Sequence, residues 1–161
     1  MKIAEALSER ADAQRRVEQL RSRIAANARY QEGEEPAEDA AALLVEVGEV
    51  LTRLRTLIAQ VNRTNSRVDL GPDGTMTDAL ATRDVLRLQH AVLTSAADAA
   101  AGQGTRHLRS ELRHLSALPV ADLRRQADEV ARTLRTLDGR IQQANWTHDL
   151  LDWTEQDWTE G

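Results

Sequence analysis

Apolar residues between positions 43 and 61 recur at alternating steps of three and four. This spacing places one stripe along a single face of a helix, and its members are Leu44, Val47, Leu51, Leu54, Ile58 and Val61. Leu43, Val50 and Leu57 widen the stripe, so the helix can contact more than one partner. We expect this helix to cover residues 37–68, far longer than the mean helix of about 11–12 residues.

The same spacing predicts three further helices. A weaker apolar seam indicates a helix over residues 2–29. Thr77 suits an N-cap, with Asp78 in the first turn, and so starts a helix over residues 77–101. The last helix covers residues 120–146, and its uninterrupted seam consists of Val120, Leu123, Ala127, Val130, Leu134, Leu137, Ile141 and Ala144.

Short connections between these helices imply that neighbours run antiparallel. Gly33 and Pro36 mark the first connection, and Gly-Pro and Asp-Gly pairs mark the second. We therefore predict an all-α fold of long antiparallel helices in a four-helix, coiled-coil-like bundle. Residues 107–118 show no decisive period, so a short helix and a short extended segment both stay open.

The predicted helices form a single helical domain over residues 1–150. Trp146 lies in the last helix, where we expect it to pack on the bundle. Residues 151–161 repeat an acidic Trp-Thr-Glu pattern around Trp153 and Trp158. We expect a poorly ordered tail there.

Composition limits the classes of function. The net charge of −5 disfavours nucleic acid as a partner. No run of about 18 apolar residues occurs, so we expect no stable membrane insertion. The chain has no cysteine, and its first residues lack the uncharged stretch of a signal peptide. These features predict a cytoplasmic protein.

Few patterns point to a reaction. The turn at residues 31–39 holds five carboxylates, but their spacing matches no EF-hand, so we favour a solvated turn over a cation site. A Glu-x-x-His pattern occurs once, from Glu111 to His114, whereas di-iron bundles need two copies. The chain has no P-loop and no nucleophile elbow. We predict no cofactor and no metal, and a non-enzymatic protein is the better expectation.

One end of the predicted bundle gathers polar residues. Antiparallel helices bring residues 1–9, 62–66, 77–84 and 145–149 to the same end. The candidate cluster consists of Asn62, Arg63, Asn65, Asp78, Arg83, Asp84, Asn145, Trp146 and His148. A network of caps and ion pairs closing the bundle is the reading we favour, and a site for a metal or small ligand is the alternative.

Several short motifs give the chain a family resemblance up to about Leu150. They are Lys2-Ile3-Ala4-Glu5-Ala6-Leu7, Gln31-Glu32-Gly33-Glu34-Glu35-Pro36, Asn62-Arg63-Thr64-Asn65, Thr77-Asp78-Ala79-Leu80 and Ile141-Gln142-Gln143-Ala144-Asn145-Trp146-Thr147. With them the chain resembles a bacterial helical family of unknown function, some members of which are named septicolysin. The resemblance implies long helices and an oligomer, and the septicolysin name implies a pore-forming toxin.

The two strong seams offer more apolar edge than one slender chain buries. We therefore expect a structural or interaction protein that forms a homo-oligomer. The alternatives are a septicolysin-like pore-forming or lytic protein, and a metal- or ligand-binding bundle that uses the polar end. A lytic role lacks support from the residues, since they provide neither a long apolar segment nor an alternating strand pair.

Overall fold

The computed structural model describes residues 1–102 and 114–152, and the chain divides into two compact units. One unit comprises residues 1–68 with the described residues from Ala144 onward, and the other comprises residues 69–143. The helices are α1 (Ile3–Asn27), α2 (Ala40–Asn65), α3 (Met76–Ala100) and α4 (Val120–Thr147). The predicted all-α fold of long antiparallel helices is confirmed, since β structure in the described residues is limited to isolated bridges.

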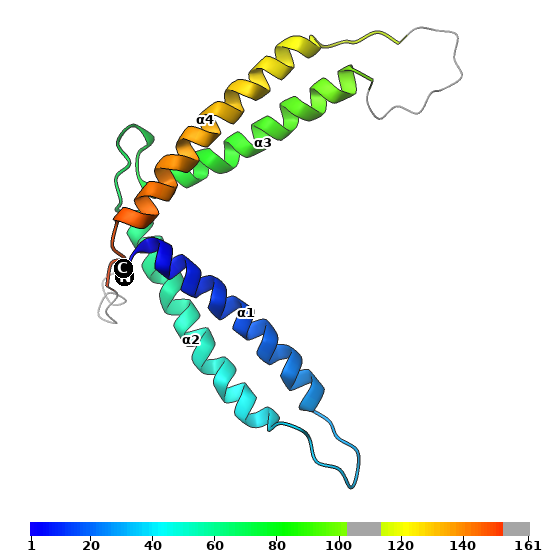
Figure 1. The fold of residues 1–161 in the computed structure, drawn as a ribbon, viewed down its shortest axis with the longest axis vertical. Coiled ribbons are helices and arrows are strands. Elements are labelled where there is room, and N and C mark those ends of the chain that lie inside the picture. Colours follow the sequence, from blue (N-terminus) through cyan, green and yellow to red (C-terminus); the bar gives the residue numbers. More distant parts are fainter. Residues whose placement is uncertain (103–113, 153–161) are drawn as a thin grey trace. The chain divides into compact units, whose positions relative to one another are not determined.

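In the first unit, α1 and α2 form an antiparallel hairpin (Figure 1). Apolar side chains from both helices fill the contact between them. The buried members are Ile3, Ala6, Leu20, Leu43, Leu57 and Val61. Ala6, Leu57 and Val61 form one cluster, against which Leu7 and Leu150 pack. The burial of this narrow seam, rather than helix propensity alone, holds two long helices together.

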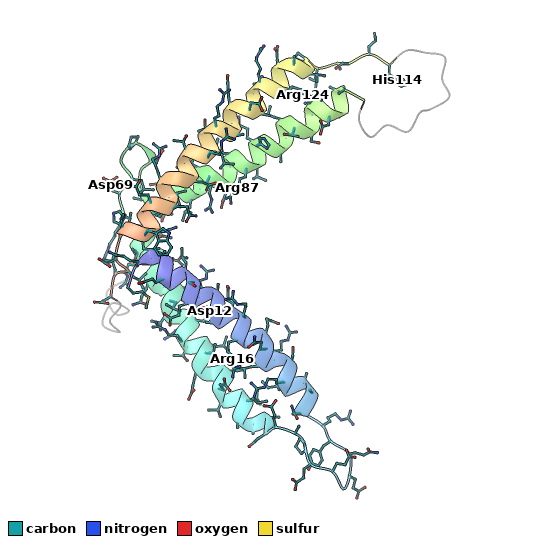
Figure 2. The ribbon with its side chains drawn as sticks, in the orientation of Figure 1. Asp12, Arg16, Asp69, Arg87, His114 and Arg124 are labelled. Carbon is teal, nitrogen blue, oxygen red and sulfur yellow. The ribbon has the colours of Figure 1, made fainter. Side chains whose placement is uncertain are left out.

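Three Arg–Glu ion pairs cross the hairpin at seven-residue intervals along α1. They join Arg53 to Glu9, Arg16 to Glu46 and Arg23 to Glu38. Figure 2 labels Arg16, whose Nε donates to Glu46 Oε1 at 2.9 Å. The hydrogen bonds from arginine hold the pKa of Glu9 and of Glu38 below the ordinary value. Because these side chains remain partly exposed to solvent, the pairs set the register of the hairpin more than its stability.

The face of α2 that contacts α1 differs from the predicted stripe. Leu43, Leu57 and Val61 are buried, whereas Leu44 and Leu51 keep 59% and 47% of their surface exposed. The residues that widen the stripe thus make most of the contact with α1. The exposed edge of the stripe is a second apolar face on α2.

In the second unit, α3 and α4 lie side by side (Figure 1). An ion pair of 3.6 Å between Arg87 Nη2 and Asp138 Oδ2 joins the two helices. The buried apolar residues are Met76, Ala79 and Ala97 of α3 with Ala127, Leu137 and Ile141 of α4. Alanines supply half of this set, so the contact is thin and the helices approach closely.

A short loop precedes α3. It contains the 3-10 turn η1 (Gly71–Asp73), and an isolated bridge between Asp69 and Thr75 closes it. Thr75 is the N-cap of α3, so the expectation that Thr77 caps this helix is wrong. The Thr75 side chain and the Asp78 side chain satisfy each other's backbone N–H groups, which is the capping-box arrangement. A cap two residues earlier lets the buried Met76 begin the helix.

The other predictions concern where helices, connections and the domain begin and end. α2 begins at Ala40 rather than at residue 37, because the Asp39 carboxylate caps it by accepting from Ala41 N at 2.8 Å. Of residues 107–118, those up to 113 lie outside the described residues, and 114–118 form neither helix nor strand. The expected tail begins with the described Leu151 and Asp152, and its remainder lies outside the described residues. A single domain over residues 1–150 stays a prediction.

Candidate functional site

The first residues of the chain are joined to the segment that follows α4. Lys2 Nζ lies 2.9 Å from Asp149 Oδ1 and donates to the carbonyl of Thr147 at 3.0 Å. Lys2 and Asp149 also form an isolated antiparallel backbone bridge. Two backbone hydrogen bonds flank this bridge, Ile3 N to His148 O at 3.2 Å and Leu150 N to Met1 O at 2.8 Å.

The end of α2 completes this arrangement through Thr64. The Thr64 side chain is buried, with 1% of its surface exposed. Its hydroxyl donates to the carbonyl of Gln60 at 2.7 Å and accepts from the backbone N–H of Leu151 at 3.0 Å. We call residues 1–3, Thr64 and residues 147–151 the terminal cluster.

Three predicted site residues at the end of α4 lie beside or within the terminal cluster. His148 Nδ1 lies 3.1 Å from the carbonyl of Ala144 and 3.2 Å from Thr147 Oγ1. Asn145 is buried, whereas Trp146 is 64% exposed. The expectation that Trp146 packs on the helices is therefore wrong. The register of α4 turns the smaller Asn145 inward beside Ala144 and the indole outward.

Three further predicted residues surround Thr64 on the last turn of α2. The carbonyl of Asn62 accepts from Ser66 N at 3.1 Å, and the carbonyl of Arg63 accepts from the Ser66 hydroxyl at 2.8 Å. Asn62 is exposed, and the side chains of Arg63 and Asn65 are half-buried. The structure thus brings the ends of α2 and α4 together through Thr64 and Leu151, as the antiparallel arrangement predicted.

The last three predicted residues belong to the second unit. Asp78 is part of the capping box of α3, and its hydrogen bonds from Thr75 hold the pKa of its carboxyl below the ordinary value. Arg83 donates to the neighbouring Asp84 at 3.1 Å, and Arg87 lies 3.8 Å from the same carboxylate. These contacts cap and brace α3.

The electrostatics of the terminal cluster centre on one carboxylate. The hydrogen bond from Lys2 holds the pKa of Asp149 below its ordinary value, and the charges of Lys2 and the N-terminal amine act in the same direction. The Asp149 side chain is mostly exposed, so solvent screens this interaction. Asp149 is thus the acidic partner in a solvent-exposed ion pair with Lys2.

The polar groups of the terminal cluster hydrogen-bond mainly to the backbone. The Lys2 ammonium, the Thr64 hydroxyl and the His148 ring all have such partners. In residues 1–102 and 114–152, no three His, Cys, Asp or Glu side chains gather closely enough to hold a metal ion. The arrangement joins the first residues of the chain to the end of α2 and to the segment after α4.

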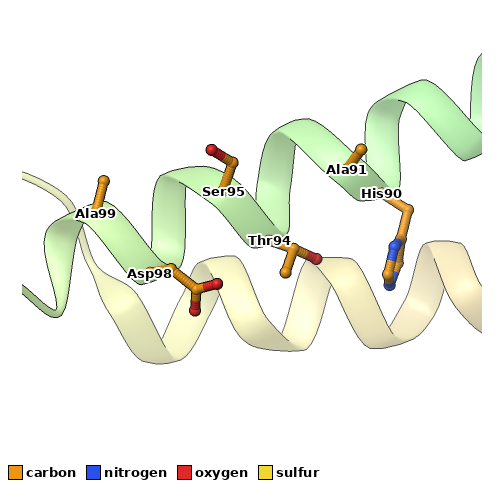
Figure 3. A pocket seen from close by; sticks show the side chains of 6 residues that line it. All are labelled: His90, Ala91, Thr94, Ser95, Asp98 and Ala99. Atoms are coloured by element: carbon orange, nitrogen blue, oxygen red, sulfur yellow. The ribbon is translucent and has the colours of Figure 1, made fainter. Parts of the chain in front are cut away.

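A shallow groove runs along α3. His90, Ala91, Thr94, Ser95, Asp98 and Ala99 line it. Figure 3 shows that His90, Thr94 and Asp98 point toward α4, while Ala91, Ser95 and Ala99 point away from it. The groove is open and borders the outer side of α3, so it does not enclose a ligand.

Within the described part of the chain, no helix is long and apolar enough to cross a membrane.

The segments that hold Lys2, Thr64 and Asp149 were expected to share one end, but these three residues were not among the candidate site residues. Lys2 is the single lysine of the chain, and Asp149 follows the last helix, but neither fact indicates that they pair. Thr64 interrupts an apolar face near its end, which gave a weak signal of a special role. Backbone bridges between distant segments have no signature in hydropathy, so the structure was needed to find them.

Comparisons with known proteins place the chain among proteins without an assigned activity. A family model described as a family of unknown function (DUF6847) matches residues 10–150. The crystal structure of a functionally unknown conserved protein from Corynebacterium diphtheriae is similar, with 36% sequence identity and a TM-score of 0.88. The match covers 94% of this chain and 99% of that one. No curated protein matches the chain.

Proposed function

Since the chain belongs to this family of unknown function, we propose from its structure that it is a non-enzymatic helical interaction protein that self-associates. The name septicolysin, which the sequence resemblance brought with it, has no support in the description of the family. The proposal instead rests on which apolar side chains the two helical units leave exposed.

The observation that carries the proposal is an exposed apolar stripe on α3. Val85, Leu88 and Val92 keep 62%, 68% and 67% of their surface exposed. Single exposed apolar residues are normal on protein surfaces. Three large ones at steps of three and four form one contiguous strip along the helix, and such patches are typical of interaction sites.

The second apolar face on α2 gives independent support. Leu44 and Leu51 are exposed and lie seven residues apart, while Val47, Leu54 and Ile58 beside them are half-buried. In each unit, therefore, one helix presents an apolar face beyond the one that its hairpin partner covers. Helices with thin seams gain most of their stability from tertiary packing, so covering these faces stabilises the fold.

The hydrogen bonds of the polar groups also support the proposal. In the terminal cluster they satisfy backbone groups or each other, as a structural role requires. A protein that acts by assembling needs exposed apolar surface, which α2 and α3 both present.

Light scattering on the purified chain at micromolar concentration tests the proposal. We expect a mass that is a multiple of the 17.9 kDa chain. A stable 17.9 kDa monomer would refute self-association.

The same preparation separates the alternatives. Release of dye from liposomes would favour the lytic alternative, whereas intact liposomes support the interaction protein. Stoichiometric metal in elemental analysis would instead favour the metal-binding alternative.

A further inference from the structure

The exposed stripe on α3 is part of a longer repeat. Its residues follow steps of four, three, four, three and four, and we call them the outer seam: Ala81, Val85, Leu88, Val92, Ser95 and Ala99. Steps of this kind average 3.5 residues, which is the spacing that keeps one face of a helix against another helix in a coiled coil. The outer seam thus has the pattern of a helix-pairing surface over most of α3.

The outer seam is separate from the face that packs on α4. The buried residues of α3 are Met76, Ala79 and Ala97. At 3.6 residues per turn, Ala79 and Ala97 lie about half a turn from Leu88, and Met76 lies about a third of a turn from it. Figure 3 agrees, since Ala91, Ser95 and Ala99 point away from α4. The helix therefore has two apolar faces, and α4 covers one of them.

The residues of the outer seam suit pairing with the same seam of a second chain. It contains no charged residue, and its bulky members are Val85, Leu88 and Val92, which alternate valine and leucine. Val at a and Leu at d positions favour pairs of helices over larger assemblies. The small Ala81, at one end, lets the helices approach closely.

The charges beside the outer seam also permit this pairing. Among the flanking positions Thr82, Asp84, Gln89, Ala91, Ala96 and Asp98, two residues are charged. Asp84 lies within ion-pair distance of Arg83 and Arg87. In a parallel pair of α3 helices the two carboxylates lie two heptads apart, so no like charges face each other.

The exposed face of α2 is a poorer match. Arg55 follows Leu51 by four residues, and Asn62 follows Arg55 by seven. Both therefore lie on the same face of the helix as Leu44 and Leu51. Placing this face on the outer seam would set a guanidinium group against Val and Leu side chains. The outer seam contains no acidic residue that could receive a guanidinium group, so α3 of a second copy fits the outer seam better than α2.

We infer that the outer seam of α3 packs against the outer seam of α3 in a second copy of this chain. The inference rests on the proposed self-association and names its interface. Leu88 lies near the centre of the seam, and in a parallel pair it contacts Leu88 of the partner.

Two variants of the full chain test this interface. Leu88→Glu introduces a carboxylate at the centre of the outer seam, where the residue is already 68% exposed within one chain. Thr136→Glu adds the same charge at an exposed position of α4 and is the control. Circular dichroism should show native helix content in both. We expect light scattering to give a monomer for Leu88→Glu and the native assembly for Thr136→Glu.

Disulfide trapping gives a second readout, because the chain has no cysteine of its own. Under mild oxidation, Leu88→Cys should form a covalent dimer in high yield, and Thr136→Cys should not. An assembled Leu88→Glu variant together with uncrosslinked Leu88→Cys would overturn this interface, while self-association itself would stand. A monomeric native chain would overturn both proposals.

Discussion

The buried hydroxyl of Thr64 accepts a 3.0 Å hydrogen bond from the backbone N–H of Leu151. This bond ties the end of α2 to the segment that follows α4. The same hydroxyl donates to Gln60 O within α2, so one side chain satisfies a distant backbone group while remaining in its helix. Thr64, a polar residue on an apolar face, thus holds two distant parts of the chain together.

Thr64→Val should remove this link with little change in shape. The Leu151 N–H then loses its partner, and we expect the free energy of unfolding to fall by about 1 kcal/mol. Hydrogen exchange should show faster exchange at the Leu151 amide. Thr52→Val is the matched control, because the exposed Thr52 hydroxyl bonds to a carbonyl of its own helix. Equal amide protection in the two variants would contradict this role of Thr64.

The ion pair between Lys2 and Asp149 should make stability depend on acid pH. The pKa of Asp149 is lower in the folded chain than in the unfolded one. Its contribution is therefore complete above the ordinary carboxyl pKa of about 4, and it is lost as the pH falls through the lowered pKa. Asp149→Asn should be less stable than the native chain at neutral pH, and the two should converge in acid.

Lys2→Met provides the control for this pH dependence. It removes the partner rather than the titrating group, so adding it to Asp149→Asn should cause only the further loss of the Lys2 hydrogen bond to the Thr147 carbonyl, which does not change with acid pH. Urea unfolding at a series of pH values measures both effects. A difference between native and Asp149→Asn chains that is the same at every pH would rule out the ion pair as its source.

Two glycines should respond in opposite directions to the same substitution. Gly74 has φ +73°, and a Cβ added there would lie 2.8 Å from Asp78 Oδ2. Gly74→Ala should therefore destabilise the chain by about 1–3 kcal/mol. Gly139 lies within α4 with no atom near an added Cβ, so Gly139→Ala should stabilise it by about 0.5–1 kcal/mol. Thermal unfolding of both variants measures these shifts, and a shared sign would contradict the local geometry.

The packing face of α2 gives a further prediction. Leu57 is fully buried against Ala6 and Val61, and Leu57→Ala should cost about 2–5 kcal/mol. Leu44→Ala removes a side chain that is 59% exposed within the unit, so its cost should be much smaller. Denaturant unfolding at one fixed protein concentration compares them. Similar losses would mean that α1 contacts the other edge of the stripe.

Much of the secondary structure was predictable from the sequence. All four helices begin and end within three residues of their expected bounds, because the apolar period is strong and Gly and Pro mark the connections. Details of capping were less predictable. Thr75 and Thr77 both suit an N-cap, and the burial of Met76 between them decides in favour of Thr75.

The face that each helix buries was not predictable in the same way. The apolar stripe of α2 is wide enough for two contacts, and its period cannot say which edge meets α1. On α3, the exposure of Val85, Leu88 and Val92 appears only once α4 is seen to occupy the other side. The terminal cluster depends on backbone pairing between distant segments, which leaves no trace in composition.

In the proposed assembly, a second copy of the chain covers the outer seam of α3. Sedimentation equilibrium of the native chain beside Leu88→Glu, over a wide range of concentration, tests it most directly. We expect a native mass of at least twice 17.9 kDa and a single-chain mass for the variant. A native chain that sediments as a 17.9 kDa monomer at every concentration would contradict it.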